Sequence, residues 1–122
     1  MTKKDLETPA WNTPLTTGRL RRWLKILREM CPTLLPVQVR FLEKTDGNVA
    51  STHLLYDDDT GLPARFVIQL DRPITVDSAA QALVHEWAHC LSWSSDRHDT
   101  VCDHDPEFGL AYSRVYQEFI QP

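Results

Sequence analysis

Apolar residues recur three and four positions apart in three stretches of the chain, which is the spacing of one buried helical face. The first stretch covers residues 17–30, with Thr16 or Thr17 placed to cap it and Pro32 to stop it. Its expected core positions are Leu20, Trp23, Leu24, Leu27 and Met30. Arginines and one lysine surround this stripe, and we interpret them as the solvated face of a packed helix rather than a nucleic-acid patch.

Alternating apolar and polar positions follow, which indicates half-buried strands. Residues 37–41 alternate clearly, residues 49–56 less so, and residues 64–70 most clearly, with Phe66, Ile68 and Leu70 on one face. The turn residues at 46–48 and the polar loop at 57–61 separate them. This order predicts a small, mostly antiparallel three-stranded sheet. Residues 64–70 are a candidate for its edge strand, being next in sequence to the following helix, although the pattern does not decide which strand lies at the edge.

A second helix is predicted from a cap at Asp77 or Ser78 to about Trp93. Its apolar stripe is Ala80, Leu83, Val84, Trp87, Ala88 and Leu91. At about 100° per residue, this stripe points well over 90° away from the mean direction of His85 and His89. One side of the helix can therefore enter the core while the two histidines face a cleft.

The last helix is predicted to start at Asp105-Pro106-Glu107, an N-cap followed by proline and an acid in the first turn. It continues nearly to the C-terminus with apolar residues at core spacing. Residues 1–17 read as an extended arm, and residues 18–122 as one domain. The fold class is therefore α+β, with an N-terminal helix, a sheet, a central helix and a C-terminal helix.

Composition restricts the partners and the cellular location that we expect for this domain. The chain has 122 residues and a net charge of −4, which argues against nucleic acid as a partner. It has no apolar run of membrane-spanning length and no secretory signal. Three cysteines without a C-x-x-C pair favour a reducing cytoplasm over a disulfide framework, although a Cys90–Cys102 bridge stays open as an alternative.

The central helix carries the motif His85-Glu86-Trp87-Ala88-His89, an H-E-x-x-H sequence. Two histidines four positions apart on one helical side can bind one zinc ion, with the glutamate between them placed beside the metal. A third ligand must come from elsewhere. We favour His104, which immediately precedes the last helix, with Glu107 as runner-up. Other loop candidates are His98, Asp99, Asp103 and Cys102.

The H-E-x-x-H motif followed by His104-x-x-x-Phe108 resembles the SprT-like minimal zincin metallopeptidases, although that family usually has glycine where this chain has Asp105. The resemblance covers roughly the second half of the chain. It implies a zincin-like fold, one Zn2+ ion, and peptide hydrolysis with Glu86 as general base for a zinc-activated water. The transition-state oxyanion then needs a further donor, for which Tyr112, Tyr56, Arg114 and His53 are candidates, with Tyr112 preferred.

Three functions follow from these observations. The first is a cytoplasmic zinc metallopeptidase that acts on peptide or protein substrates. The second is a zincin-fold binding or regulatory module in which zinc is structural and catalysis is weak or absent. The third, and weakest, is a nucleic-acid-associated protein that uses the arginine-rich helix.

Overall fold

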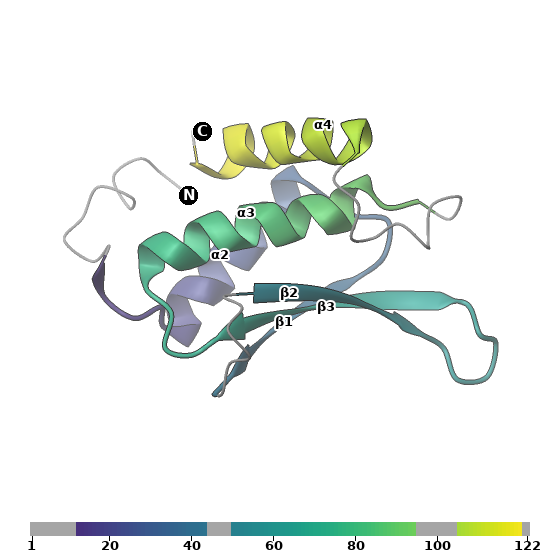
Figure 1. Ribbon diagram of the computed structural model, residues 1–122, viewed down its shortest axis with the longest axis horizontal. Coiled ribbons are helices and arrows are strands. Elements are labelled where there is room, and N and C mark those ends of the chain that lie inside the picture. Colours follow the sequence, from purple (N-terminus) through teal and green to yellow (C-terminus); the bar gives the residue numbers. More distant parts are fainter. Residues whose placement is uncertain (1–11, 44–49, 95–104, 121–122) are drawn as a thin grey trace.

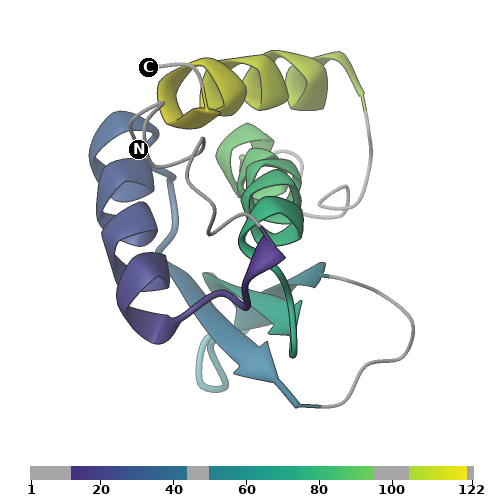
Figure 2. The same ribbon diagram turned by 90° about the vertical axis from the view of Figure 1, so that its left-hand side faces the viewer.

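The computed structural model describes residues 12–43, 50–94 and 105–120. Within these ranges the protein is α+β, with helices stacked on one face of a sheet (Figures 1 and 2). The elements in chain order are α2 (Thr17–Met30), β1 (Val37–Leu42), β2 (Ala50–Tyr56), β3 (Pro63–Asp71), α3 (Val76–Ser92), α4 (Pro106–Val115) and a short π-helical segment, η3 (Tyr116–Ile120).

The sheet is mixed, and this corrects the mostly antiparallel arrangement predicted from the sequence. Its strand order is β1-β3-β2, in which β3 pairs parallel with β1 and antiparallel with β2. Val39 lies opposite Ile68 in the parallel pair, and Thr52 lies opposite Ile68 in the antiparallel pair. Strand β3 is therefore central rather than at the edge, and the edge positions belong to β1 and β2.

The apolar content of β3 explains its central place. Phe66, Val67 and Ile68 are three consecutive buried residues, so even Val67, on the face away from the helices, is shielded from solvent. A strand with so many buried residues is stabilised most by a paired strand on either side. Strands whose alternate residues are exposed are better suited to an edge position in the sheet. In β1 and β2 the alternate residues Gln38, Arg40 and His53 are exposed.

The helices form two layers above the sheet. Helices α2 and α3 lie next to it, and α4 crosses over α3 on the side away from the strands (Figure 2). Segment η3 packs against α2, because the buried ring of Phe119 meets Trp23 of α2 edge-on at a centroid distance of 5.4 Å. The main core cluster thus joins the inner sheet face to α2, α3 and the C-terminal residues.

Local capping sets the helix boundaries. The Thr16 hydroxyl accepts from the Arg19 amide and Asp105 accepts from the Phe108 amide, which confirms both predicted caps. Helix α3 instead begins at Val76 under a Thr75 cap, which corrects the predicted Asp77 or Ser78. The Thr75 hydroxyl accepts from the Ser78 amide, while Gln81 donates to the Asp77 carboxylate rather than completing a capping box.

The end of the predicted N-terminal arm is held against the segment that leads into α3. The Leu15 amide donates to the Ile74 carbonyl at 2.8 Å, and the Val76 amide donates to the Thr13 carbonyl at 2.9 Å. The Leu15 side chain is buried. Residues 1–11 of that arm lie outside the described residues. No helix in the described ranges has both the length and the apolar character of a membrane span.

Candidate metal centre

The two motif histidines turn their ring nitrogens toward each other on α3. The Nε2 atom of His85 lies 3.2 Å from the Nε2 atom of His89. The ring centroids are 4.9 Å apart and the ring planes are nearly perpendicular, at 75°. The spacing of four along the helix places both rings on one side, and their rotamers make the same nitrogen of each converge on one point.

This separation fits two ligands of one tetrahedral zinc ion. With zinc–nitrogen bonds of about 2.0–2.1 Å and a near-tetrahedral angle, two ligand nitrogens stand about 3.3 Å apart. The donor chemistry also fits, because imidazole nitrogens are common zinc ligands. The same distance suits a hydrogen bond between two neutral imidazoles, one donating and one accepting.

Aromatic side chains of α4 form one wall of this site. The Phe108 ring lies 4.5 Å from the His89 ring and 5.3 Å from the His85 ring, centroid to centroid. The Tyr112 ring lies 6.4 Å from that of His85. Phe108 also packs with Ala88 and Ala111, so it joins α4 to α3 directly beside the histidines. An apolar wall of this kind restricts water and fixes the imidazole orientation.

Strand β2 forms the opposite wall and holds the motif glutamate. The Thr52 hydroxyl donates a short hydrogen bond to the Oε2 atom of Glu86, although the two residues are 34 positions apart in sequence. Glu86 is only 8% exposed, and His89 only 6%. A buried carboxylate is costly unless a donor satisfies it, so Thr52 is what allows Glu86 to sit at this wall.

The burial of His89 differs from the sequence-based expectation of an open histidine face. Most of the predicted apolar stripe is buried as expected, and Leu91 is half-buried. However, Phe108 of α4 packs against the His89 ring, and β2 lies against the neighbouring residue Glu86. His85 is half-buried and the more exposed of the two histidines.

The predicted third ligand lies outside the described residues, as do His98, Asp99, Asp103 and Cys102. Among the described residues no three histidine, cysteine, aspartate or glutamate side chains gather in a metal-binding group. The runner-up Glu107, exposed in the first turn of α4, therefore does not complete such a group with His85 and His89. The described part of the chain supplies two converging nitrogens and one buried carboxylate, that of Glu86, from the residue that follows His85 on the same helix.

The four proposed oxyanion donors lie at different places. Tyr112 is the one whose ring neighbours His85. Arg114 donates instead to the Met30 carbonyl at 3.2 Å, which directs it toward α2. Tyr56 is exposed at the end of β2. His53 is exposed on the alternate face of β2 from Thr52, where it bonds with the Ser51 hydroxyl at 3.1 Å.

Cys90 follows His89 directly but is poorly suited to bind metal. Its side chain is fully buried, and burial first and the Glu86 charge second raise the pKa of its thiol far above the ordinary value. Burial likewise raises the pKa of the Cys31 thiol. Both thiols are free and buried, so neither presents the thiolate that coordinates zinc.

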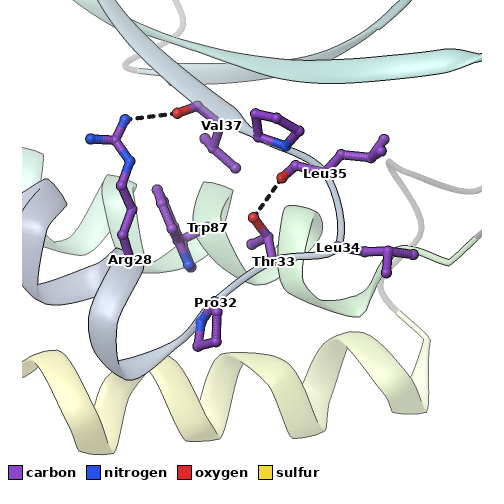
Figure 3. Close-up of a pocket in the computed structure, with 8 residues that line it drawn as sticks. Arg28, Pro32, Thr33, Leu34, Leu35, Val37 and Trp87 are labelled. Atoms are coloured by element: carbon purple, nitrogen blue, oxygen red, sulfur yellow. Dashed lines mark hydrogen bonds between the residues drawn. The ribbon is translucent and has the colours of Figure 1, made fainter.

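A hollow of about 440 Å³ on the opposite side of α3 has no comparable chemistry (Figure 3). Trp87 lines it from α3, together with the segment from Pro32 to Val37. Its one charged lining residue in the described chain, Arg28, donates to the Val37 carbonyl at 2.8 Å. This hollow is a gap between α2, β1 and α3. Its described lining has no histidine, cysteine or carboxylate, and the Thr33 hydroxyl donates to the Leu35 carbonyl.

Sequence reasoning identified the histidines and Glu86 but missed Thr52. The one sequence signal for Thr52 was its place as a polar residue between Ala50 and Leu54, which both pack against the core. That signal becomes informative only when β2 is known to lie beside α3. Comparison of the chain with models of known protein families and with curated protein sequences gives no match.

Proposed function

We propose that this protein is a zinc-dependent metallopeptidase with its centre on α3. The observation that carries the proposal is the convergence of the His85 and His89 Nε2 atoms at 3.2 Å on the helix that also buries the Glu86 carboxylate, one position after His85. A histidine pair buried only for packing has no need of a carboxylate at the same site. A hydrolytic zinc site needs both, since nitrogens hold the metal and an adjacent carboxylate handles protons.

His85 and His89 would hold the zinc ion, with His104 as the proposed third ligand. His104 precedes Asp105 in sequence, and Asp105 caps the helix whose first turn brings Phe108 against His89. When bound, zinc supplies Lewis-acid chemistry that acidifies water and polarises a peptide carbonyl. Three protein ligands would leave one position open to water or substrate.

The remaining steps belong to side chains of this chain. Glu86 takes a proton from the attacking water and returns it to the leaving amine. Thr52 keeps the Glu86 carboxylate at the β2 wall through its hydroxyl hydrogen bond. Tyr112 is the proposed donor to the developing oxyanion, because its ring lies beside His85.

An edge strand beside the site offers a way to align a substrate. In the described chain β2 pairs with β3 alone, so its other edge can pair with an extended peptide. Thr52 places that edge next to Glu86, whereas the sequence had pointed to β3. A peptide or protein substrate in extended form is therefore proposed. A reducing, cytoplasmic setting remains part of the proposal and suits the buried thiols of Cys31 and Cys90.

The test compares Glu86→Gln with wild type on a broad peptide library, with zinc content measured on the same samples. We expect a loss of peptide cleavage of about 10²–10⁴-fold in Glu86→Gln with zinc retained. Glu29→Gln, on the exposed surface of α2, is the matched control and should cleave normally. Zinc-loaded wild type that cleaves no peptide would contradict hydrolysis and favour the binding or regulatory module.

A further inference from the structure

A second cavity lies next to the candidate metal centre, along the line of α3 that leads to His85. Asp77, Gln81, His85 and His89 are spaced by four and form one row on the helix. Asp77 and Gln81 line a cavity of about 260 Å³ between the first half of α3 and the C-terminal helical segments. Gln81 is one helical turn from His85, about 6 Å along the axis.

Tyr112 links this cavity to the candidate centre. Its ring neighbours His85 at 6.4 Å and also lines the cavity. On the cavity side it stacks with Tyr116, with ring centroids 6.4 Å apart and planes inclined by 16°. A substrate backbone bound at the histidine pair would therefore have this cavity within reach of a neighbouring side chain.

The size and lining of the cavity suit one long side chain. Its volume of about 260 Å³ lies below that of pockets that enclose whole small ligands, about 300–1,000 Å³. Ala80, Val84 and Ile120 provide apolar walls. Such walls pack well against the methylene stem of a lysine or arginine, whose charged head then extends toward a polar end.

The polar end of the cavity carries a negative charge. Asp77 is its one acidic lining residue in the described chain, and no lysine or arginine of that part lines it. Gln81 donates to the Asp77 Oδ1 atom at 3.2 Å and so holds the carboxylate on the α3 row. The N-terminus of α3 contributes about half a positive charge, which the full charge of Asp77 outweighs.

We propose that this cavity selects substrates with an arginine or lysine side chain close to the scissile bond. The methylene stem packs on the half-buried Ile120, the cation meets the faces of Tyr112 and Tyr116, and Asp77 binds its charge. A purely apolar side chain would contact the apolar walls but leave the Asp77 carboxylate without a cationic partner. The inference rests on the proposed peptidase function, for which it names the substrate class.

The test uses three matched peptides that differ at one position near the scissile bond: arginine, its uncharged analogue citrulline, or norleucine. Because Asp77 is exposed, its ion pair should be worth about as much as a surface pair. We expect kcat/KM for arginine to exceed that for citrulline about fivefold at one scanned position. In Asp77→Asn this ratio should fall to about twofold, because only the contact of the cation with the tyrosine faces remains, and Asp77→Glu should restore part of the loss.

Binding is measured in parallel, so that the cavity is tested without turnover. Glu86→Gln, alone and combined with Asp77→Asn, is titrated with fluorescent forms of the same peptides. Tyr116→Ala should weaken arginine binding as well. Asp58→Asn, in the exposed loop after β2, is the matched charge control. It should change neither the arginine-to-citrulline ratio of kcat/KM nor the corresponding ratio of binding affinities. Thermal unfolding of each variant confirms that it is folded.

The outcomes separate the two proposals. Cleavage without an arginine preference, or with a preference that Asp77→Asn leaves intact, overturns the proposed role of the cavity in substrate selection. The peptidase proposal then still holds. Arginine-selective binding that depends on Asp77, without any cleavage, supports the cavity and overturns the peptidase. The absence of both cleavage and Asp77-dependent binding overturns both.

Discussion

The two sides of α3 bury side chains of opposite chemistry. On one side Trp87 is fully buried, and its Nε1–H donates to the Cys31 carbonyl at 2.9 Å. On the other side Glu86 and His89 are almost as buried, but their neighbours are the Thr52 hydroxyl and the Phe108 ring. A burial profile along the sequence does not separate these sides, whereas their partners do.

From this difference we propose that one side of α3 stabilises the fold and the other carries the chemistry. Apolar burial around Trp87 contributes favourable free energy of folding. Burial of Glu86 costs free energy unless its carboxylate keeps a hydrogen-bond donor. Proteins tolerate such costs mainly where a function requires them. Substitutions on the two sides should therefore separate stability from activity.

The largest effect is expected for Trp87→Ala. Removal of this ring leaves a cavity in the core and should lower the free energy of unfolding by about 3–5 kcal/mol. Urea denaturation measures this change. Trp87→Phe, which keeps most of the ring but loses the hydrogen bond to Cys31, should cost much less. A loss below about 1 kcal/mol in Trp87→Ala would show that this side does not anchor the fold.

The next effect is expected for Thr52→Val on the chemistry side. The change is isosteric but leaves the buried Glu86 carboxylate without its hydroxyl donor, at a cost of about 1–3 kcal/mol. Because Glu86 then shifts from its position, peptide cleavage should fall about tenfold, while zinc is retained. Ser51→Ala, which lies on the alternate face of β2, is the control. Unchanged cleavage in Thr52→Val would remove Thr52 from the site.

A smaller effect is expected at the N-cap of α4. Asp105→Ala removes the acceptor for the Phe108 amide and should lower stability by about 0.5–2 kcal/mol. Since Phe108 packs against His89, the same change should also weaken zinc binding in a chelator competition. Thr16→Ala removes the equivalent cap of α2 and serves as the comparison. It should lower stability similarly and leave zinc binding unchanged, and equal loss of zinc in both variants would contradict the link.

The smallest effect is expected at Asp57, which lies on neither side of α3. Hydrogen bonds from the backbone amides of Thr60 and Asp59 lower the pKa of its carboxyl. The folded-state pKa is depressed, so its small contribution to stability is present above the ordinary aspartate pKa and is lost as the pH falls through the lowered value. A carboxyl NMR titration should give a midpoint below that of an unfolded peptide. An unshifted midpoint would contradict the hydrogen bonds from the Thr60 and Asp59 amides to the Asp57 carboxylate.

The helices and the motif were predictable from the sequence because their signals are local. The Thr16 and Asp105 caps, the helical spacing of the apolar residues and the His85-Glu86-x-x-His89 motif each depend on residues within one or two turns. The structure confirms the two caps, the helical segments and the distribution of most buried positions on α3.

The sheet order and the Thr52–Glu86 contact were not predictable, because they depend on distant residues. Alternation identified the strands but did not show that β3 lies between β1 and β2. The Thr75 cap was missed because several capping residues adjoin one another at 75–78, and only the backbone decides among them. Thr52 became recognisable once β2 was placed beside α3.

Zinc content tests the central claim most directly. Protein purified without added metal is analysed for zinc as wild type, His85→Ala and His53→Ala, in which His53 is an exposed histidine on the outer face of the sheet. We expect one zinc ion per chain in wild type and in His53→Ala, and none in His85→Ala, with all three proteins folded. Wild type without zinc, or His85→Ala with a full complement, would contradict a metal centre at His85 and His89.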